Sequence, residues 1–264
     1  MRVHHHWLLE REHLPCMHPA LIEPVKASSV RLWASLLRWV LGARMAILVL
    51  VFVILQIERA LSCNDVRVNI ESPKPSMAPE ICTAATHAIN QLKACGVELK
   101  RPLSIKIAED AGRDGGAGAY GCYQKGTERI QLLPFEQCAE RLRRDKERSG
   151  LDAADYFRSV VVHEVVHAVL AQQTQFGELS TIVHEYLAYA LQIDSMQPES
   201  REAMLRPVRL PKGTAPQPPH EILLFMSPAT FGAQAYFHFK SQPSTCTALD
   251  DMLTGRLVLP RISE

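Results

Sequence analysis

Two histidines four residues apart, with a glutamate directly after the first, are the residues best placed to do chemistry. They are His163, Glu164 and His167, and they interrupt an otherwise apolar run over residues 160–169. In an α-helix, positions four apart lie on one face, one turn apart, so both imidazoles could bind the same ion. Neutral imidazoles are common zinc ligands, and an adjacent carboxylate can act as general base. The pattern predicts a metal site on a helix.

A third ligand is expected downstream, where His184 and Glu185 are the candidates. His167 lies about 8 Å before the end of its predicted helix and Glu185 about 9 Å after the start of the next, at about 1.5 Å per residue. If the two helices are antiparallel, both side chains therefore lie at the same height. His184 and Glu185 point about 100° apart, so both cannot easily share one ion with the histidines.

The spacing of these residues resembles the gluzincin zinc metallopeptidases, the thermolysin-like group, in which His-Glu-x-x-His is followed by a ligand Glu. Residues 185–189 also resemble the glutamate helix of small peptidase-MA-like domains. The resemblance favours Glu185 over His184 and implies Zn²⁺ bound by His163, His167 and Glu185. It further implies peptide-bond hydrolysis by zinc-activated water with Glu164 as general base. By the same analogy, an edge hairpin of a mixed sheet binds extended substrate.

One departure from that group concerns the partner of the first histidine. Thermolysin-like enzymes orient it with an Asp four residues after the ligand Glu, where this chain has Tyr189. The partner of His163 must therefore come from elsewhere. The departure keeps open a second hypothesis, a catalytically inactive binding or scaffold domain of the cell envelope. A third hypothesis is a membrane-tethered structural domain in which the motif is accidental.

Gluzincins also stabilise the oxyanion with a downstream His or Tyr, for which His220, Tyr236 and His238 are candidates. The metzincin branch is excluded, because Leu170 and Gln173 stand where its Gly and third His would be.

The flanking sequence predicts an α+β fold that positions these residues. A small mixed β-sheet precedes the metal helix, and an antiparallel helix bearing Glu185 and a helical C-terminal part follow. Alternating apolar residues predict strands at 64–72, 97–108, 119–124 and 129–133, the last two forming a hairpin. Helices are expected at 79–94, 135–146, 152–172, 179–193, 199–205, 220–226, 230–240 and 245–254.

The N-terminal part predicts export. Residues 45–57 contain no charged side chain. They are too few for a bilayer-spanning helix of about 20 residues but suit the apolar region of a signal. Small residues at positions 60 and 62 allow cleavage before Cys63, and residues 28–44 are basic and amphipathic.

We therefore divide the chain into a basic amphipathic N-terminal extension (1–44), a signal peptide or membrane anchor (45–62) and a zinc-metallopeptidase-like domain (63–264). The domain is expected in the periplasm or outside the cell, tethered to the membrane if the signal is uncleaved.

Cysteine usage also supports export. Six cysteines follow the apolar segment: Cys63, Cys82, Cys95, Cys122, Cys138 and Cys246. An even number predicts up to three disulfides, with reduced buried thiols as the alternative. The net charge of +1 gives no indication of nucleic-acid binding. The expected partners are a peptide or protein substrate and, through the N-terminal segment, the membrane.

Overall fold

The computed structural model describes residues 61–63, 66–72, 75–109, 119–145, 148, 150–208 and 216–262, and every structural statement below concerns these residues. The predicted N-terminal extension and the apolar segment 45–57 lie outside them. None of the helices in these ranges is long and apolar enough to cross a bilayer.

The predicted α+β fold is confirmed. Within the described residues, one mixed sheet has the strand order β1-β2-β3-β5-β4. The central strands β2, β3 and β5 are parallel, whereas β1 and β4 are antiparallel to their neighbours. The strands are β1 (Leu61–Cys63), β2 (Val68–Glu71), β3 (Leu103–Ile107), β4 (Gly121–Gln124) and β5 (Arg129–Leu132). The predicted hairpin is β4–β5, and β4 lies at an edge of the sheet.

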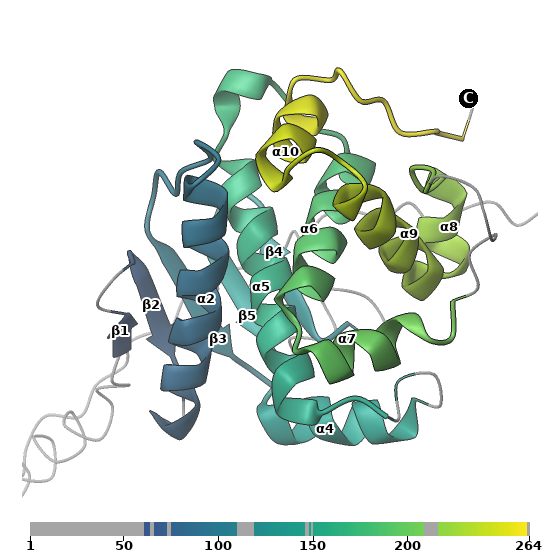
Figure 1. Cartoon of the computed structure of the whole chain (residues 1–264). Helices are drawn as coiled ribbons and strands as arrows, with labels where there is room; N and C mark the ends of the chain where they lie inside the picture. The colour runs from purple at the N-terminus through teal and green to yellow at the C-terminus, as the bar shows by residue number, and fades with distance from the viewer. Residues whose placement is uncertain are drawn as a thin grey trace, which may run out of the picture.

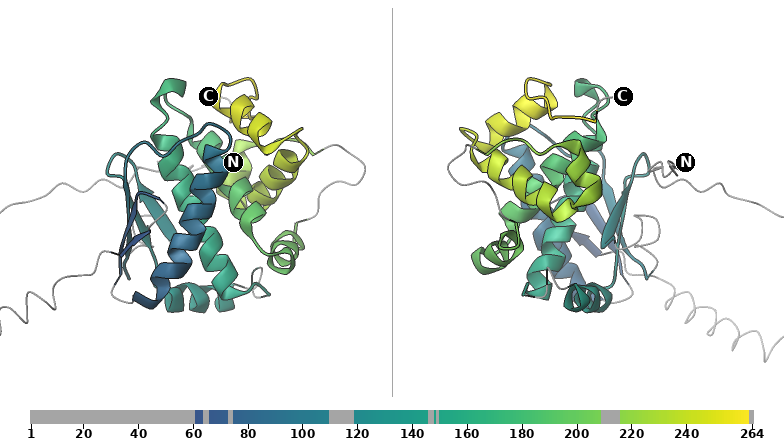
Figure 2. Two further views of the ribbon diagram at one scale, coloured as in Figure 1. Left: turned by 60° about the vertical axis from the view of Figure 1, so that its left-hand side comes forward. Right: turned by 90° about the vertical axis from the view of Figure 1, so that its right-hand side faces the viewer.

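The helices are stacked in layers on the sheet (Figures 1 and 2). Helices α2 and α5 pack on the sheet side, α6 packs against α5, and α9 packs against α6. The helices are α2 (Ala78–Lys93), α4 (Phe135–Arg144), α5 (Ala153–Ala171), α6 (Thr181–Ser195), α7 (Pro198–Leu205), α8 (Glu221–Met226), α9 (Pro228–Lys240) and α10 (Thr245–Leu253), with 3₁₀ turns η1 (Pro75–Met77) and η2 (Thr174–Phe176).

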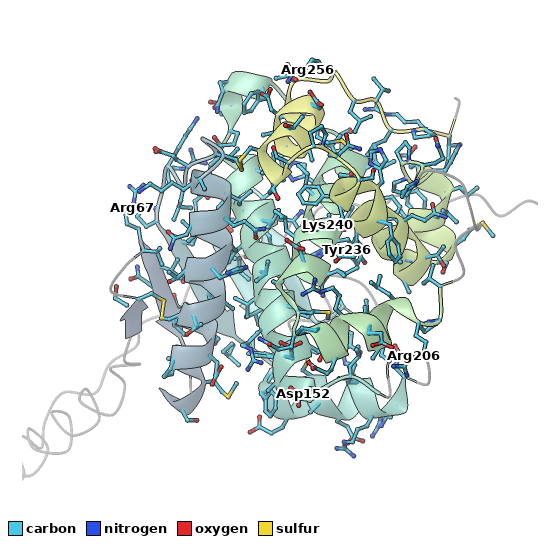
Figure 3. All side chains as sticks on the ribbon, in the orientation of Figure 1. Arg67, Asp152, Arg206, Tyr236, Lys240 and Arg256 are labelled. Atoms are coloured by element: carbon cyan, nitrogen blue, oxygen red, sulfur yellow. A yellow bond between two sulfur atoms is a disulfide. The ribbon has the colours of Figure 1, made fainter. Side chains whose placement is uncertain are left out.

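Helix α5 lies in the middle of these layers because it is apolar on nearly every side. Asp152 caps its N-terminus by accepting a hydrogen bond of 2.8 Å from the Asp155 N–H (Figure 3). After η2, Gly177 adopts a φ of 73°, which favours glycine, and the chain turns into α6. At the other end of α6, Asp194 pairs with Lys240 of α9 at 3.1 Å (Figure 3).

Two predicted strands differ in their bounds. The segment 64–72 contributes only β2, and a further strand, β1, lies in residues that the sequence assigned mainly to the end of the signal segment. The segment 97–108 contributes only β3, because Pro102 has no N–H and the preceding amides are bound elsewhere.

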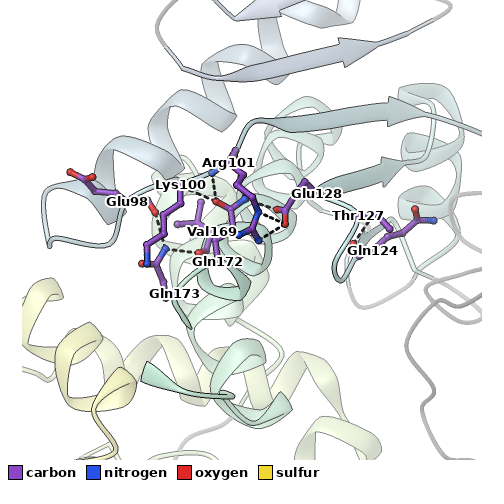
Figure 4. A network of polar contacts seen from close by, with 9 residues as sticks. All are labelled: Glu98, Lys100, Arg101, Gln124, Thr127, Glu128, Val169, Gln172 and Gln173. Carbon is purple, nitrogen blue, oxygen red and sulfur yellow. Dashed lines mark hydrogen bonds and ion pairs between the residues drawn. The ribbon is translucent and has the colours of Figure 1, made fainter. Parts of the chain in front are cut away.

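Those amides are bound by Gln172, just after the end of α5 (Figure 4). Its Oε1 accepts from the N–H groups of Lys100 and Arg101, both at 2.8 Å. Its Nε2 donates to the Arg101 carbonyl at 3.2 Å and to Glu128 Oε2 at 2.5 Å. Glu128 lies in the β4–β5 turn, so this fully buried amide fixes the hairpin against α5.

We expect Gln172→Leu to lower the free energy of unfolding by about 2–4 kcal/mol, because two backbone N–H groups lose their acceptor. Urea denaturation of the full chain measures this. The matched control is Gln175→Leu, at an exposed position nearby, which should change stability much less. Equal losses in the two variants would contradict the role of Gln172.

Two disulfides are formed. Cys63–Cys82 joins β1 to α2, and Cys95–Cys246 joins the end of α2 to α10. The third bridge that the sequence allowed is not formed. Cys122 and Cys138 are buried thiols. Burial raises the pKa of Cys138 to about 12, so its thiol stays protonated. Two disulfides are typical of a protein that matures in an oxidising, exported location.

Candidate metal centre

Side chains from α5 and α6 converge on one point. Ligand atoms of His163, His167 and Glu185 all lie within 4.8 Å of one another. The two Nε2 atoms are 3.0 Å apart, and the Glu185 oxygens lie 3.7 Å from Nε2 of His163 and 3.5 Å from Nε2 of His167. Ligands around a tetrahedral ion with bonds of about 2.0–2.1 Å would lie about 3.3 Å apart. The predicted residues thus form a possible metal-binding triad.

His184, the rival candidate, is not part of this triad. Its ring stacks on His167 with centroids 5.8 Å apart and an interplanar angle of 26°. Burial, followed by the charge of Lys125, lowers the pKa of His184 to about 4.

Both histidines of the triad are uncharged at neutral pH. Burial, followed by the neighbouring His167, lowers the pKa of His163 to about 4. Burial, followed by His184, lowers the pKa of His167 to about 3. A metal-ligating histidine must be a neutral imidazole, and both rings already are.

The partner of His163 is Gln192, whose Oε1 lies 3.0 Å from His163 Nδ1. Tyr189, at the position where thermolysin-like enzymes have an Asp, instead packs edge-on against His163 with ring centroids 4.8 Å apart. The Tyr189 ring leaves no room for a side chain on Gly232, where a Cβ would lie 2.9 Å from its Cδ1. Sequence reasoning missed Gln192, although its position seven residues after Glu185 puts it on nearly the same helix face.

Glu164 points from α5 toward β4 and is 6% exposed. A Cβ at Gly121 would lie 2.8 Å from Glu164 Cγ, so only glycine leaves space for the carboxylate. The Tyr123 N–H donates to that carboxylate. Burial, followed by the charge of Glu185, raises the pKa of Glu164 to about 8. Sequence reasoning did not find Gly121 or Tyr123, since neither has a recognisable spacing from the motif.

This raised pKa predicts a pH-dependent effect of Glu164→Gln on the metal-free chain. Between pH 4.5 and about 8, folded Glu164 holds a proton that the unfolded chain has released, so wild-type stability falls as pH rises through this window. We expect the variant to be more stable than wild type at about pH 9, by on the order of a few kcal/mol, with a much smaller difference at about pH 5. Urea unfolding of zinc-free protein measures both. A difference independent of pH would contradict the burial of an ionisable Glu164.

The three candidates for oxyanion stabilisation make other contacts. His220 caps α8 by accepting from Ile222 N at 3.2 Å. Tyr236 lies on α9, and its hydroxyl accepts a hydrogen bond from Arg201 at 3.3 Å (Figure 3). His238 Nδ1 lies 2.7 Å from the hydroxyl of the buried Tyr186. None of these partners belongs to the triad or to β4.

The comparisons with known proteins place the chain in a family without assigning a function. A family model described as a family of unknown function, DUF6639, matches residues 68–262. The chain belongs to this family. Neither the curated proteins nor the solved structures gave a match. The matched region begins at the first residue of β2 and includes the whole triad, Glu164 and Gln192.

Proposed function

We propose that this member of DUF6639 is an exported zinc-dependent metallopeptidase. The observation that carries the proposal is the triad of His163, His167 and Glu185, with the buried carboxylate of Glu164 beside it. The separations of the ligand atoms and the uncharged state of both rings fit a small divalent cation.

Zinc is the ion that two imidazoles and one carboxylate commonly bind, with one position left for water or substrate. When bound, it would supply a Lewis acid that polarises the scissile carbonyl and lowers the pKa of water. His163, His167 and Glu185 would hold it.

Glu164 would act as the general base. Its carboxylate would take a proton from the attacking water and pass the proton to the leaving amine. The Tyr123 N–H holds one side of the carboxylate, and Gly121 leaves space for it beside the sheet.

Strand β4 is the proposed substrate edge. The Leu133 N–H donates to the Tyr120 carbonyl at 3.0 Å, which makes these two residues a hydrogen-bonded pair. Because such pairs alternate along an antiparallel ladder, Gly121 and Tyr123 direct their backbone groups away from β5. The bond from Tyr123 to Glu164 agrees with this direction. An extended peptide added along this edge would lie next to the base.

Export is supported by the two disulfides. We further propose that the domain lies in the periplasm or outside the cell and, if the signal is uncleaved, is tethered to the membrane through residues 45–57.

The test is metal-dependent cleavage of a peptide library by the full chain, followed by mass spectrometry. We expect cleavage that is lost on treatment with a chelator and restored by zinc. A chain that binds one zinc ion but cleaves nothing would instead be a binding or scaffold domain. A chain that binds no metal would make the motif accidental.

A further inference from the structure

Three linked hydrogen bonds connect the backbone of α5, through a side chain of α6, to the first histidine of the motif, His163. The Ser159 hydroxyl lies 2.7 Å from the Tyr156 carbonyl. Gln192 Nε2 lies 3.2 Å from that hydroxyl, and Gln192 Oε1 lies 3.0 Å from His163 Nδ1. Ser159 is 1% exposed and Gln192 is 4% exposed, so water scarcely competes for these bonds.

Only one assignment of donors and acceptors allows all three of these hydrogen bonds to form together. A backbone carbonyl can only accept, so Ser159 gives its single hydroxyl proton to Tyr156 O. The Ser159 oxygen must then accept, and Gln192 offers its Nε2–H. The amide oxygen consequently faces His163, whose Nδ1 must carry the proton.

We propose that Ser159 and Gln192 hold His163 in the Nδ1–H tautomer, so that the lone pair of its Nε2 is directed into the triad before any metal binds. Gln192 is then the positioning residue for the first ligand, and Ser159 fixes the orientation of the Gln192 amide. A neutral amide thereby does what a carboxylate does in the resembling enzymes. The inference deepens the proposed function and rests on it for the metal, whereas the tautomer belongs to the metal-free chain.

The same proton assignment predicts the opposite tautomer for the second histidine in the metal-free chain. A hydrogen bond between the two Nε2 atoms, 3.0 Å apart, needs a proton on one of them. Since the proton of His163 is on Nδ1, His167 donates from Nε2. If His167 holds zinc through Nε2, that proton would leave Nε2 while another would be taken up at Nδ1. The His167 ring would then stay neutral and change tautomer, whereas His163 would not.

Nitrogen NMR of the full chain with ¹⁵N-labelled histidine tests these tautomers directly. In metal-free wild type we expect the proton on Nδ1 of His163 and on Nε2 of His167. Addition of zinc should change the tautomer of His167 alone. A metal-free His163 found with its proton on Nε2 would overturn the proposal, and this measurement needs no variant that could fail to fold.

Zinc affinity, measured by competition with a chromophoric chelator, tests the two positioning residues. Gln192→Met removes the acceptor and should weaken zinc binding about 10–100-fold. Ser159 makes no hydrogen bond to His163, but Ser159→Ala would let the Gln192 amide rotate. This variant should therefore also weaken zinc binding and give a mixture of His163 tautomers. Gln192→Glu keeps an acceptor toward Nδ1 and should restore both the tautomer and most of the affinity.

The matched control is Ser195→Ala. Like Ser159, Ser195 donates at 2.7 Å to the backbone carbonyl three residues earlier, here that of Gln192. Its contact is to the Gln192 backbone, whereas Ser159 also contacts the Gln192 side chain. Its loss should leave tautomer and affinity unchanged, and equal effects of Ser159→Ala and Ser195→Ala would overturn the proposal. If the tautomers are as stated but no peptide is cleaved, the proposed peptidase activity is wrong and the positioning role stands.

Discussion

Replacement of Glu164 by glutamine is expected to abolish peptide hydrolysis while the metal stays bound. Glu164 is not one of the three residues whose ligand atoms converge, so its change leaves the triad intact. The amide keeps the shape of the side chain but cannot take a proton from water. Loss of a general base typically costs about 10²–10⁴-fold in rate, so kcat/KM should fall by at least this order. Metal content and cleavage rate are measured on the same preparation.

The matched control for this experiment is Glu202→Gln, at an exposed position on α7 where the carboxylate pairs with Arg206, the residue that follows the helix. It should retain full activity. Wild-type activity in Glu164→Gln would contradict the proposed mechanism. Loss of both activity and metal would show that Glu164 supports the ion itself.

The second large effect is expected from Glu185→Ala. It removes the carboxylate that joins α6 to the two imidazoles of α5, and two ligands alone hold zinc poorly. The affinity should fall further than the roughly 10–100-fold typical of losing an outer partner of a ligand. Elemental analysis after gel filtration, together with chelator competition, measures this loss.

His184→Asn is the matched comparison, because His184 directly precedes Glu185 and stacks on His167 without joining the triad. This variant should keep its metal. If His184→Asn lost zinc and Glu185→Ala kept it, the third ligand would have been assigned to the wrong residue.

The core of the site could be predicted from the sequence because local geometry determines most of it. Positions four apart on a helix must face the same way, so His163 and His167 were fixed by spacing alone. Glu185 needed one further assumption, that α5 and α6 are antiparallel, and the resemblance to gluzincins supplied the choice over His184. The structure brings these three residues together.

The supporting residues could not be predicted, because tertiary contacts determine them. A glycine is needed at position 121 because the Glu164 side chain packs against β4. Nothing in the sequence of β4 indicates a neighbour 43 positions later. Gln192 is identified only once α6 is seen to pack on α5 beside Ser159.

The fold shows the same division between local and tertiary control. The helix bounds follow apolar periodicity and caps such as Asp152. The segment 97–102 has the alternation of a strand, yet Gln172 takes two of its amides and keeps it out of the sheet. The disulfide pairing likewise required the chain to bring Cys95 beside Cys246, 151 positions away.

The central claim is that α5 and α6 hold one zinc ion through two imidazoles and one carboxylate. X-ray absorption at the zinc edge, on the full chain purified with zinc, measures this most directly. We expect two imidazole nitrogens at about 2.0–2.1 Å and carboxylate or water oxygen at about 2.0–2.2 Å. A spectrum with sulfur ligands, or one without imidazole scattering, would contradict the account.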